Sequence, residues 1–200
     1  LLFLAHLANS NLVDCGIISA GKFGRTANSL VSNYVQMSES ATETFFSLSN
    51  LSPDNKNFPN DNPATETNIE HYHKTFLTIT VETLEMSVFF SEKTYKPILH
   101  RHPFIIVGKT GMLKKLKSFG FKTFDKWWDE SYDDEPDLIR RYTSAFNQVI
   151  DLMSQDPIKI ITKLKPVLEH NHNHLCGWIQ QSREQIIQLR EDSIKSLIIR

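Results

Sequence analysis

The sequence predicts an α/β fold: a Rossmann-like parallel sheet with helices on both faces, followed by a helical C-terminal third. Residues 76–81 and 104–107 are apolar runs rich in β-branched side chains, which is typical of buried strands, and a helical segment separates them. The succession of strand, helix and strand is typical of a doubly wound layer with right-handed crossovers. After Pro136, apolar residues recur at helical spacing and predict helices for the rest of the chain.

Length and composition are those of an ordinary globular protein. The chain has 200 residues, of which 40% are hydrophobic and 22% are charged, enough for one domain or two small ones. The net charge of -1 argues against a surface dedicated to nucleic acid. Its two cysteines, Cys15 and Cys176, exclude a disulfide scaffold and favour a reducing compartment, so we expect a cytoplasmic protein. No apolar run is long enough to predict a membrane-spanning helix.

The first half of the chain carries the weaker signals. Residues 1–12 have the spacing of an amphipathic helix, residues 16–19 are a short strand candidate, and Phe45 and Phe46 are expected in the core. Residues 47–68 hold three prolines among Asn, Asp and Ser, which predicts a long loop. Because the chain begins inside a predicted helix without an initiator Met, we expect it to be a piece of a longer protein.

The elements of the sheet have clearer boundaries. Ser91 has the character of an N-cap, and Glu92 stands in the first turn of a helix that should run to about His100. A second helix follows the 104–107 strand and should end at Gly120. Residues 121–124 are a candidate for a third, short strand.

The last third of the chain is expected to pack on the rest. We predict an α/β domain over residues 1–135 and C-terminal helices over residues 136–200 that cover its sheet. Between two of these helices we expect a junction, at the run that contains His170, His172, His174 and Cys176. A zinc site is the alternative there, but alternate residues share a face on a strand and not on a helix, so we favour the junction.

A constellation of charged residues lies where this fold would bind a ligand. Glu82 follows the 76–81 strand, and Glu92 and Lys93 begin the next helix. Ligands of open α/β sheets bind at the carboxyl ends of the strands, where helix N-termini offer N–H groups to anions. Lys93 suits a diphosphate, and the Glu92 carboxylate can accept hydrogen bonds from both hydroxyls of a ribose. The pattern favours a nucleoside diphosphate, while a glutamate that only stabilises its own helix is the simpler alternative.

These residues resemble the donor-binding motif of the α-1,3-fucosyltransferases, a Glu-Asn pair followed by Tyr-x-Thr-Glu-Lys. The longer pattern is similar to a family of phage, giant-virus and bacterial glycosyltransferase-like proteins, which share the Thr-Glu-Lys-Thr-x-Lys-Pro motif found here in variant form at residues 91–97. They also share a Pro-Phe-Ile-Ile-x-Gly strand and the segments found here at residues 120–124 and 128–133. The resemblance spans about residues 76–141.

The resemblance implies a nucleotide-sugar-dependent glycosyltransferase of GT-B architecture. This chain would be its C-terminal donor-binding domain, and the acceptor domain that carries the general base would lie N-terminal to it. Glu92 would hold the donor ribose, Lys93 the diphosphate, and Glu82 would lie near the sugar or the phosphates. The remaining motif positions are Thr83 and Ser91, which stand where the family has Asn and Thr, and Tyr95 and Lys96.

The implied partners are a nucleotide-sugar donor, such as a GDP-sugar, and a glycan or another acceptor. Fucose is one candidate sugar, although the changes at Thr83 and Ser91 leave the sugar open. No metal or other cofactor is required, because a helix dipole and Lys93 can stabilise the leaving diphosphate. Two alternatives remain: a non-catalytic nucleotide- or sugar-binding domain, and a structural α/β domain that mediates assembly through its helical tail.

Two further groups have a structural and a functional interpretation. Residues 127–133 form an acidic and aromatic segment that either shapes the rim of a cleft or buries a tryptophan while its carboxylates cap the helix after Pro136. We favour the second interpretation. Lys109 begins a basic run that is best explained as a solvated helix face, although it is also placed to touch a phosphate.

Overall fold

The computed structural model describes residues 1–18, 20, 31, 34–49, 69–82 and 87–198. Within these residues, the sheet consists of two parallel strands, β1 (Thr78–Val81) and β2 (Phe104–Val107), joined by helix α5 (Glu92–Leu99). The register places Thr78 beside Phe104 and Val81 beside Val107. The parallel pairing and the helical crossover confirm the predicted strand–helix–strand unit.

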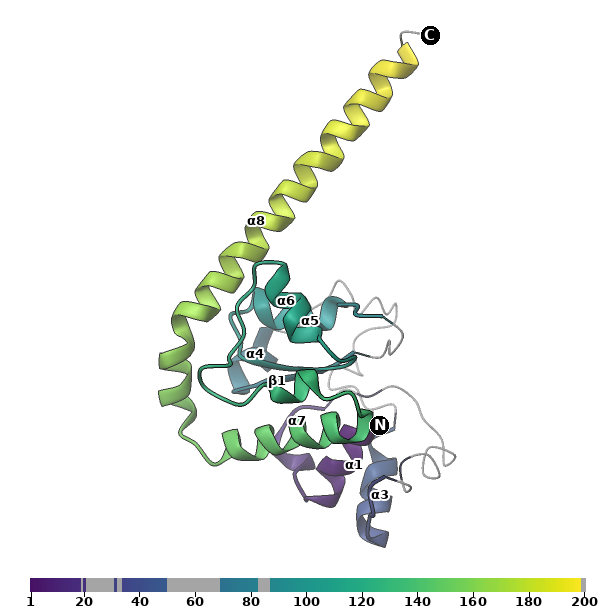
Figure 1. Ribbon diagram of the computed structural model, residues 1–200, viewed down its shortest axis with the longest axis vertical. Coiled ribbons are helices and arrows are strands. Elements are labelled where there is room, and N and C mark those ends of the chain that lie inside the picture. Colours follow the sequence, from purple (N-terminus) through teal and green to yellow (C-terminus); the bar gives the residue numbers. More distant parts are fainter. Residues whose placement is uncertain (19, 21–30, 32–33, 50–68, 83–86, 199–200) are drawn as a thin grey trace.

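Helices surround this small sheet, so the chain is a mixed α/β structure in which helix predominates (Figure 1). Helices α5 and α6 (Met112–Ser118) lie on one side of the strands, and α7 (Leu138–Met153) lies on the other (Figure 1). The other helical elements are α1 (Leu2–Asn9), η1 (Val13–Cys15), α3 (Glu39–Ser47), α4 (Ile69–Lys74), η2 (Ser131–Asp134) and α8 (Pro157–Ile198).

The core is built around β2. All four residues of this strand are buried, and Phe104 packs edge-on against Phe124 at 4.8 Å between ring centroids. A second, smaller cluster joins α1 to α3 through Ala5, Ala8 and Phe45, and Phe46 packs against it half-buried. These two clusters account for the apolar spacing in both halves of the sequence.

The predicted third strand at residues 121–124 is wrong, because side chains pair with this segment where a strand would. Asn171 on α8 accepts a hydrogen bond from the backbone N–H of Lys122 at 2.8 Å and donates one to its carbonyl at 2.8 Å. The Glu130 carboxylate accepts from the N–H of Phe124 at 2.7 Å. Three of its four residues are buried, and the segment is irregular and does not join the sheet.

Two expectations for the first half have different outcomes. The helix predicted over residues 1–12 is present as α1 and ends at Asn9. The strand predicted at residues 16–19 is wrong for residues 16–18, which are irregular, and residue 19 lies outside the described residues. Most of the loop predicted at residues 47–68 also lies outside the described residues. At its start, residue 47 belongs to α3 and residue 48 is the C-cap of that helix.

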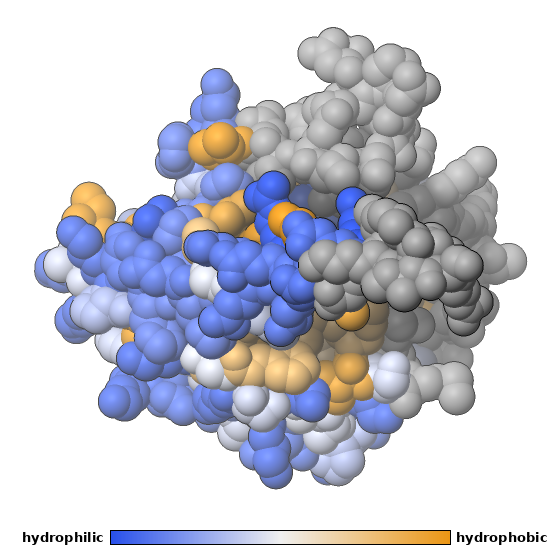
Figure 2. Space-filling view, turned by 90° about the horizontal axis from the view of Figure 1, so that it is seen from above, coloured by the Kyte–Doolittle hydropathy of each residue, from blue (hydrophilic) through white to orange (hydrophobic). Residues whose placement is uncertain are grey.

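The C-terminal third is helical, but the predicted junction near residue 170 is wrong. Helix α8 runs unbroken through that region. Its first half packs along the body, and its second half projects into solvent instead of covering the sheet (Figure 1). Where described residues form the surface viewed along this projecting end, it is mostly hydrophilic, with separate apolar patches (Figure 2).

Histidines of α8 bond the ends of two other helices. The Nδ1 of His172 donates to the carbonyl of Leu99 at 2.7 Å, at the C-terminus of α5. The Nε2 atoms of His170 and His174 donate to the carbonyls of Gly120 and Phe119, at the C-terminus of α6. The alternating histidines thus satisfy carbonyls that have no partner within their own helices, and this role explains their spacing.

Candidate functional site

The polar face of β1 holds the crossover helix in place. Thr78, Thr80 and Glu82 alternate along the chain and therefore point to the same face. Thr78 Oγ1 lies 2.8 Å from Nδ1 of His102, just beyond the end of α5, and Thr80 Oγ1 donates to the carbonyl of Lys93 at 3.0 Å. The strand thus fixes both ends of the helix that carries the predicted site.

Glu82 is the centre of this arrangement. Its side chain is buried, and its Oε1 accepts hydrogen bonds from the backbone N–H of Ser91 at 2.9 Å, the Ser91 hydroxyl at 3.0 Å and the Thr94 hydroxyl at 2.7 Å. We expected Glu82 to lie near the sugar or the phosphates of a donor, but its buried Oε1 is engaged inside the protein. Its carboxylate instead ties the end of β1 to the first turn of α5.

The start of α5 matches the sequence prediction closely. Ser91 is the N-cap, and its hydroxyl accepts from the backbone N–H of Lys93 at 3.2 Å. Glu92 lies in the first turn, half-buried, and the Lys93 side chain is exposed. Since Ser91 and Glu82 accept hydrogen bonds from donors at the helix start, fewer N–H groups point to solvent than an empty anion site would offer.

The other motif residues divide between the aromatic packing and the surface. Tyr95 is half-buried and packs against Phe90, Phe121 and Trp178, with ring centroids 6.3–6.4 Å apart. Burial, together with the negative charge of Glu82, raises the pKa of the Tyr95 phenol. Lys96 lies in the last turn of α5, on the partly exposed surface, and Thr83 lies outside the described residues.

A buried arginine lies at the carboxyl end of β2. Arg141 of α7 donates from Nε to the carbonyl of Gly108 at 2.7 Å and from Nη1 to Thr110 Oγ1 at 2.9 Å. Nη1 also donates to the carbonyl of Glu135 at 2.7 Å. Sequence reasoning missed this residue, although an arginine at a position of the apolar helical period, one residue before Tyr142, is a signal for a buried charge.

Glu82 and Arg141 meet at Gly108. A Cβ at this glycine would lie 3.2 Å from Cβ of Glu82, so the two strand ends approach closely there. At the carboxyl edge of the sheet, Glu82 and Arg141 form a buried, hydrogen-bonded interior. Two lysines lie at the rim of this edge, the exposed Lys93 and the half-buried Lys109. Positive charge on a rigid edge can attract and orient a phosphate group.

The acidic and aromatic segment has a structural role close to the one we favoured. Trp128 is buried and lies against Phe124, with ring centroids 4.6 Å apart. However, the Asp133 carboxylate caps α6, accepting from the N–H groups of Leu113 at 2.9 Å and Lys114 at 3.0 Å, whereas Asp137 caps α7. The expected capping of the helix after Pro136 by these carboxylates is therefore wrong.

Burial changes the acidity of this segment. Desolvation raises the pKa of Glu130 although Thr123 and Phe124 donate hydrogen bonds to it. Desolvation likewise raises the pKa of Asp133, although the hydrogen bonds from the N–H groups of Leu113 and Lys114 lower it. Both carboxylates have internal partners, which indicates that they organise the loop.

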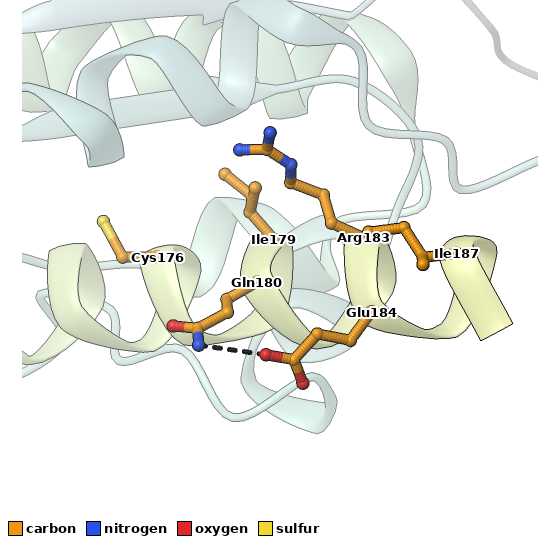
Figure 3. Close-up of a pocket in the computed structure, with 6 residues that line it drawn as sticks. All are labelled: Cys176, Ile179, Gln180, Arg183, Glu184 and Ile187. Atoms are coloured by element: carbon orange, nitrogen blue, oxygen red, sulfur yellow. Dashed lines mark hydrogen bonds between the residues drawn. The ribbon is translucent and has the colours of Figure 1, made fainter.

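A shallow hollow lies elsewhere, along the projecting half of α8. Its lining consists of side chains of this one helix: Cys176, Ile179, Gln180, Arg183, Glu184 and Ile187 (Figure 3). It is an open helix face, with Gln180 donating to Glu184 at 3.0 Å, and it contains none of the predicted donor-binding residues.

The described residues contain no group of three or more His, Cys, Asp and Glu side chains arranged to hold a metal ion. The Sγ of Cys176 lies 3.6 Å from Nε2 of His172, and the other histidines nearby bond carbonyls. In the same part of the chain, no helix combines the length and apolar composition needed to cross a bilayer.

Comparison with other proteins adds no relative to this description. The chain matches no protein-family model, and no curated protein or solved structure is significantly similar to it.

Proposed function

We propose that this chain is the donor-nucleotide-binding domain of a nucleotide-sugar-dependent glycosyltransferase, half of a GT-B fold with a Rossmann-like sheet. The observation that carries the proposal is the parallel β1–α5–β2 unit, whose crossover helix begins with Ser91, Glu92 and Lys93 at the carboxyl end of the sheet. This is where parallel sheets bind nucleotides. The sequence motif at the same place supports the assignment.

In this proposal each motif residue has a distinct role. Lys93 binds the diphosphate with its exposed ammonium, and Glu92 binds the ribose hydroxyls. Glu82 acts as a positioning residue, because its carboxylate holds Ser91 and Thr94 and so fixes the first turn of α5. An acceptor, such as a glycan, and the general base would come from another domain.

A second candidate is a structural domain that mediates assembly. The observation in its favour is the projecting half of α8, which exposes apolar side chains beyond the body. The hydrogen bonds of Glu82 to Ser91 and Thr94 are also compatible with this alternative, because they stabilise the fold. Nucleotide binding separates the two candidates.

Lys93→Ala tests the donor site. We expect the intact chain to bind GDP, UDP or ADP measurably in calorimetry or ligand-observed NMR, and Lys93→Ala to weaken the preferred nucleotide about ten- to a hundredfold, because a charge-assisted phosphate contact is worth about 1.5–3 kcal/mol. The melting temperature should hardly change, since the Lys93 side chain is exposed.

Lys163→Ala is the matched control, because this exposed lysine lies on α8 away from the motif. The affinity of the Lys163→Ala variant for the preferred nucleotide should equal that of the unmodified chain. Absence of binding by all three nucleotides at about millimolar concentration would contradict the donor site. Equal loss of affinity in both variants would show non-specific attraction of the phosphates to positive charge.

A further inference from the structure

Cys176 and His172 form a pair on one face of α8. They are four residues apart, so they are neighbours on successive turns of the helix. The Sγ of Cys176 lies 3.6 Å from Nε2 of His172, within the hydrogen-bond distance of a sulfur atom. The cysteine is exposed, so a small molecule in solution can reach its thiol.

The second nitrogen of His172 determines where the proton of the ring lies. Nδ1 donates to the carbonyl of Leu99 at 2.7 Å, at the C-terminus of α5. A neutral imidazole has one N–H, so with the proton on Nδ1 the Nε2 atom is an acceptor that faces the thiol. A nucleophile, a base within its reach and a third group that orients the base form the arrangement that activates cysteine side chains.

The surroundings of His172 favour transfer of the thiol proton to its ring. The imidazolium that forms carries a positive charge, which is favourable beside the C-terminal carbonyls of α5. Glu169 of α8 interacts electrostatically with His172, and its negative charge also stabilises the imidazolium. His100, the C-cap of α5, interacts with the same ring, but burial lowers the pKa of His100, so it adds little opposing charge at neutral pH.

The hollow on α8 indicates which molecules the thiol meets. Cys176 lines one end of it, and Ile179 and Arg183 point to the same side of the helix as the thiol (Figure 3). Arg183 lies two turns beyond the cysteine, about 10 Å along the helix axis, and its guanidinium can bind a carboxylate. Glu184 points to the opposite side, where it accepts a hydrogen bond from Gln180 (Figure 3). The face beside the thiol therefore suits a small molecule that carries a carboxylate.

We propose that Cys176 is a reactive thiol that exchanges with small disulfides bearing carboxylates, with His172 as its base. Nε2 takes the proton of the thiol, and the thiolate attacks one sulfur of the disulfide. A new S–S bond forms to Cys176 while the original S–S bond breaks. The departing half leaves as a thiolate and takes the proton from Nε2, so it is reduced to a thiol while the Cys176 sulfur is oxidised to a mixed disulfide. This chemistry is independent of nucleotide binding at the edge of the sheet.

Reaction of the full chain with glutathione disulfide at about pH 7 tests the proposal, with peptide mass spectrometry to follow both cysteines in one sample. Cys15 is the internal reference, because it is exposed and its thiol has no hydrogen-bond partner among the described residues. We expect Cys176 to react about five- to tenfold faster, since only a few per cent of an ordinary thiol is ionised at this pH. His172→Asn should remove most of this difference, although its amide can still donate to Leu99.

His170→Asn is the matched control, because His170 donates to the carbonyl of Gly120 on the other side of the helix contact. The rate at Cys176 should be unchanged in this variant. At about pH 9.5, where an ordinary thiol ionises without a base, His172→Asn and the unmodified chain should react at similar rates. Circular dichroism of each variant shows whether it is folded.

Arg183→Gln tests the preference for a carboxylate. This variant should react at least about twofold more slowly with glutathione disulfide at low salt, and no more slowly with cystamine, a disulfide that carries amines in place of carboxylates. Equal slowing with both disulfides would overturn the stated preference.

Equal rates at Cys176 and Cys15 would overturn the reactive thiol, as would a His172→Asn variant that reacts at the unmodified rate at about pH 7. A slower reaction of His172→Asn that persists at about pH 9.5 would mean that the substitution changes access to the thiol, and it would overturn the role of His172 as the base.

Discussion

At the scale of single residues, the carboxyl edge of the sheet divides its charges between interior and rim. Glu82 and Arg141 are buried and bond backbone and hydroxyl groups, whereas Lys93 is exposed. The Oε1 of Glu82 accepts three internal hydrogen bonds, whereas the exposed ammonium of Lys93 can donate to a ligand. The residues that bind and the residues that position are therefore different, although they are neighbours in one motif.

Glu82→Ala should lower the free energy of unfolding by at least about 2 kcal/mol, because it leaves Ser91 and the buried Thr94 without their acceptor, at about 1–3 kcal/mol for a buried donor. Urea unfolding measures this change. Glu92 lies half-buried in the first turn of α5, and Glu92→Ala should cost at most about 1 kcal/mol, the interaction of its carboxylate with the helix dipole. If Glu82→Ala kept its stability and lost nucleotide binding, the carboxylate would be a ligand and our assignment of a positioning role would be contradicted.

The sequence predicted local features of this site and missed the long-range ones. The N-cap role of Ser91 follows from its neighbours in the chain, and it was correct. The burial of Glu82 depends on Thr94, which reaches it only after the crossover helix has docked. Arg141 is 33 residues from its acceptor Gly108, a separation that no local pattern reveals.

At the scale of elements, residues 121–124 show how tertiary contacts overrule a local preference. The segment has the composition of a strand, yet the Asn171 amide bonds both the N–H and the carbonyl of Lys122. One side chain thus does for Lys122 what a neighbouring strand would do. Strand-forming composition predicts an extended backbone, and the partner that satisfies this backbone is set by the whole fold.

Asn171→Ala should destabilise the chain by about 1–3 kcal/mol, because the part-buried N–H and carbonyl of Lys122 lose their buried amide partner together. Thermal or urea unfolding measures this loss. Asn173→Ala is the control, since Asn173 is exposed on the same helix and should change stability little. Equal effects of the two substitutions would mean that helix propensity, and not the amide pairing, determines the result.

At the scale of the whole molecule, histidines connect elements that are distant in sequence. His6 of α1 stacks on Phe146 of α7 at 5.0 Å, and His100 stacks on Tyr72 of α4 at 4.6 Å. His102 lies between Thr75 and Thr78 with both ring nitrogens within 2.8 Å of an oxygen. The packing of several helices therefore depends on imidazole rings, of which that of His102 is buried and those of His6 and His100 are half-buried.

This burial makes the stability of the fold depend on pH. Desolvation lowers the pKa of His6 and His102 below 6.5, and desolvation together with His73 and His172 lowers that of His100. At a given pH these rings bind more protons in the unfolded chain than in the folded chain, because their pKa is higher when unfolded. The folded state therefore loses stability as the pH falls through about 6.5, the pKa of histidine in the unfolded chain. At lower pH, the raised pKa values of Glu130 and Asp133 act in the opposite direction.

We therefore expect the free energy of unfolding to decrease as the pH falls from about 7.5 to about 5.5. Below that range it should decrease less steeply. There, Glu130 and Asp133 take up protons in the folded chain at a higher pH than in the unfolded chain. Urea unfolding at a series of pH values measures both slopes. His6→Gln removes one of the three rings and should reduce the upper slope, whereas His73→Gln, an exposed control on α4, should reduce it less. A stability that stays constant or rises on acidification from about pH 7.5 would show that the rings are already protonated in the folded chain, held by carbonyls such as that of Thr75.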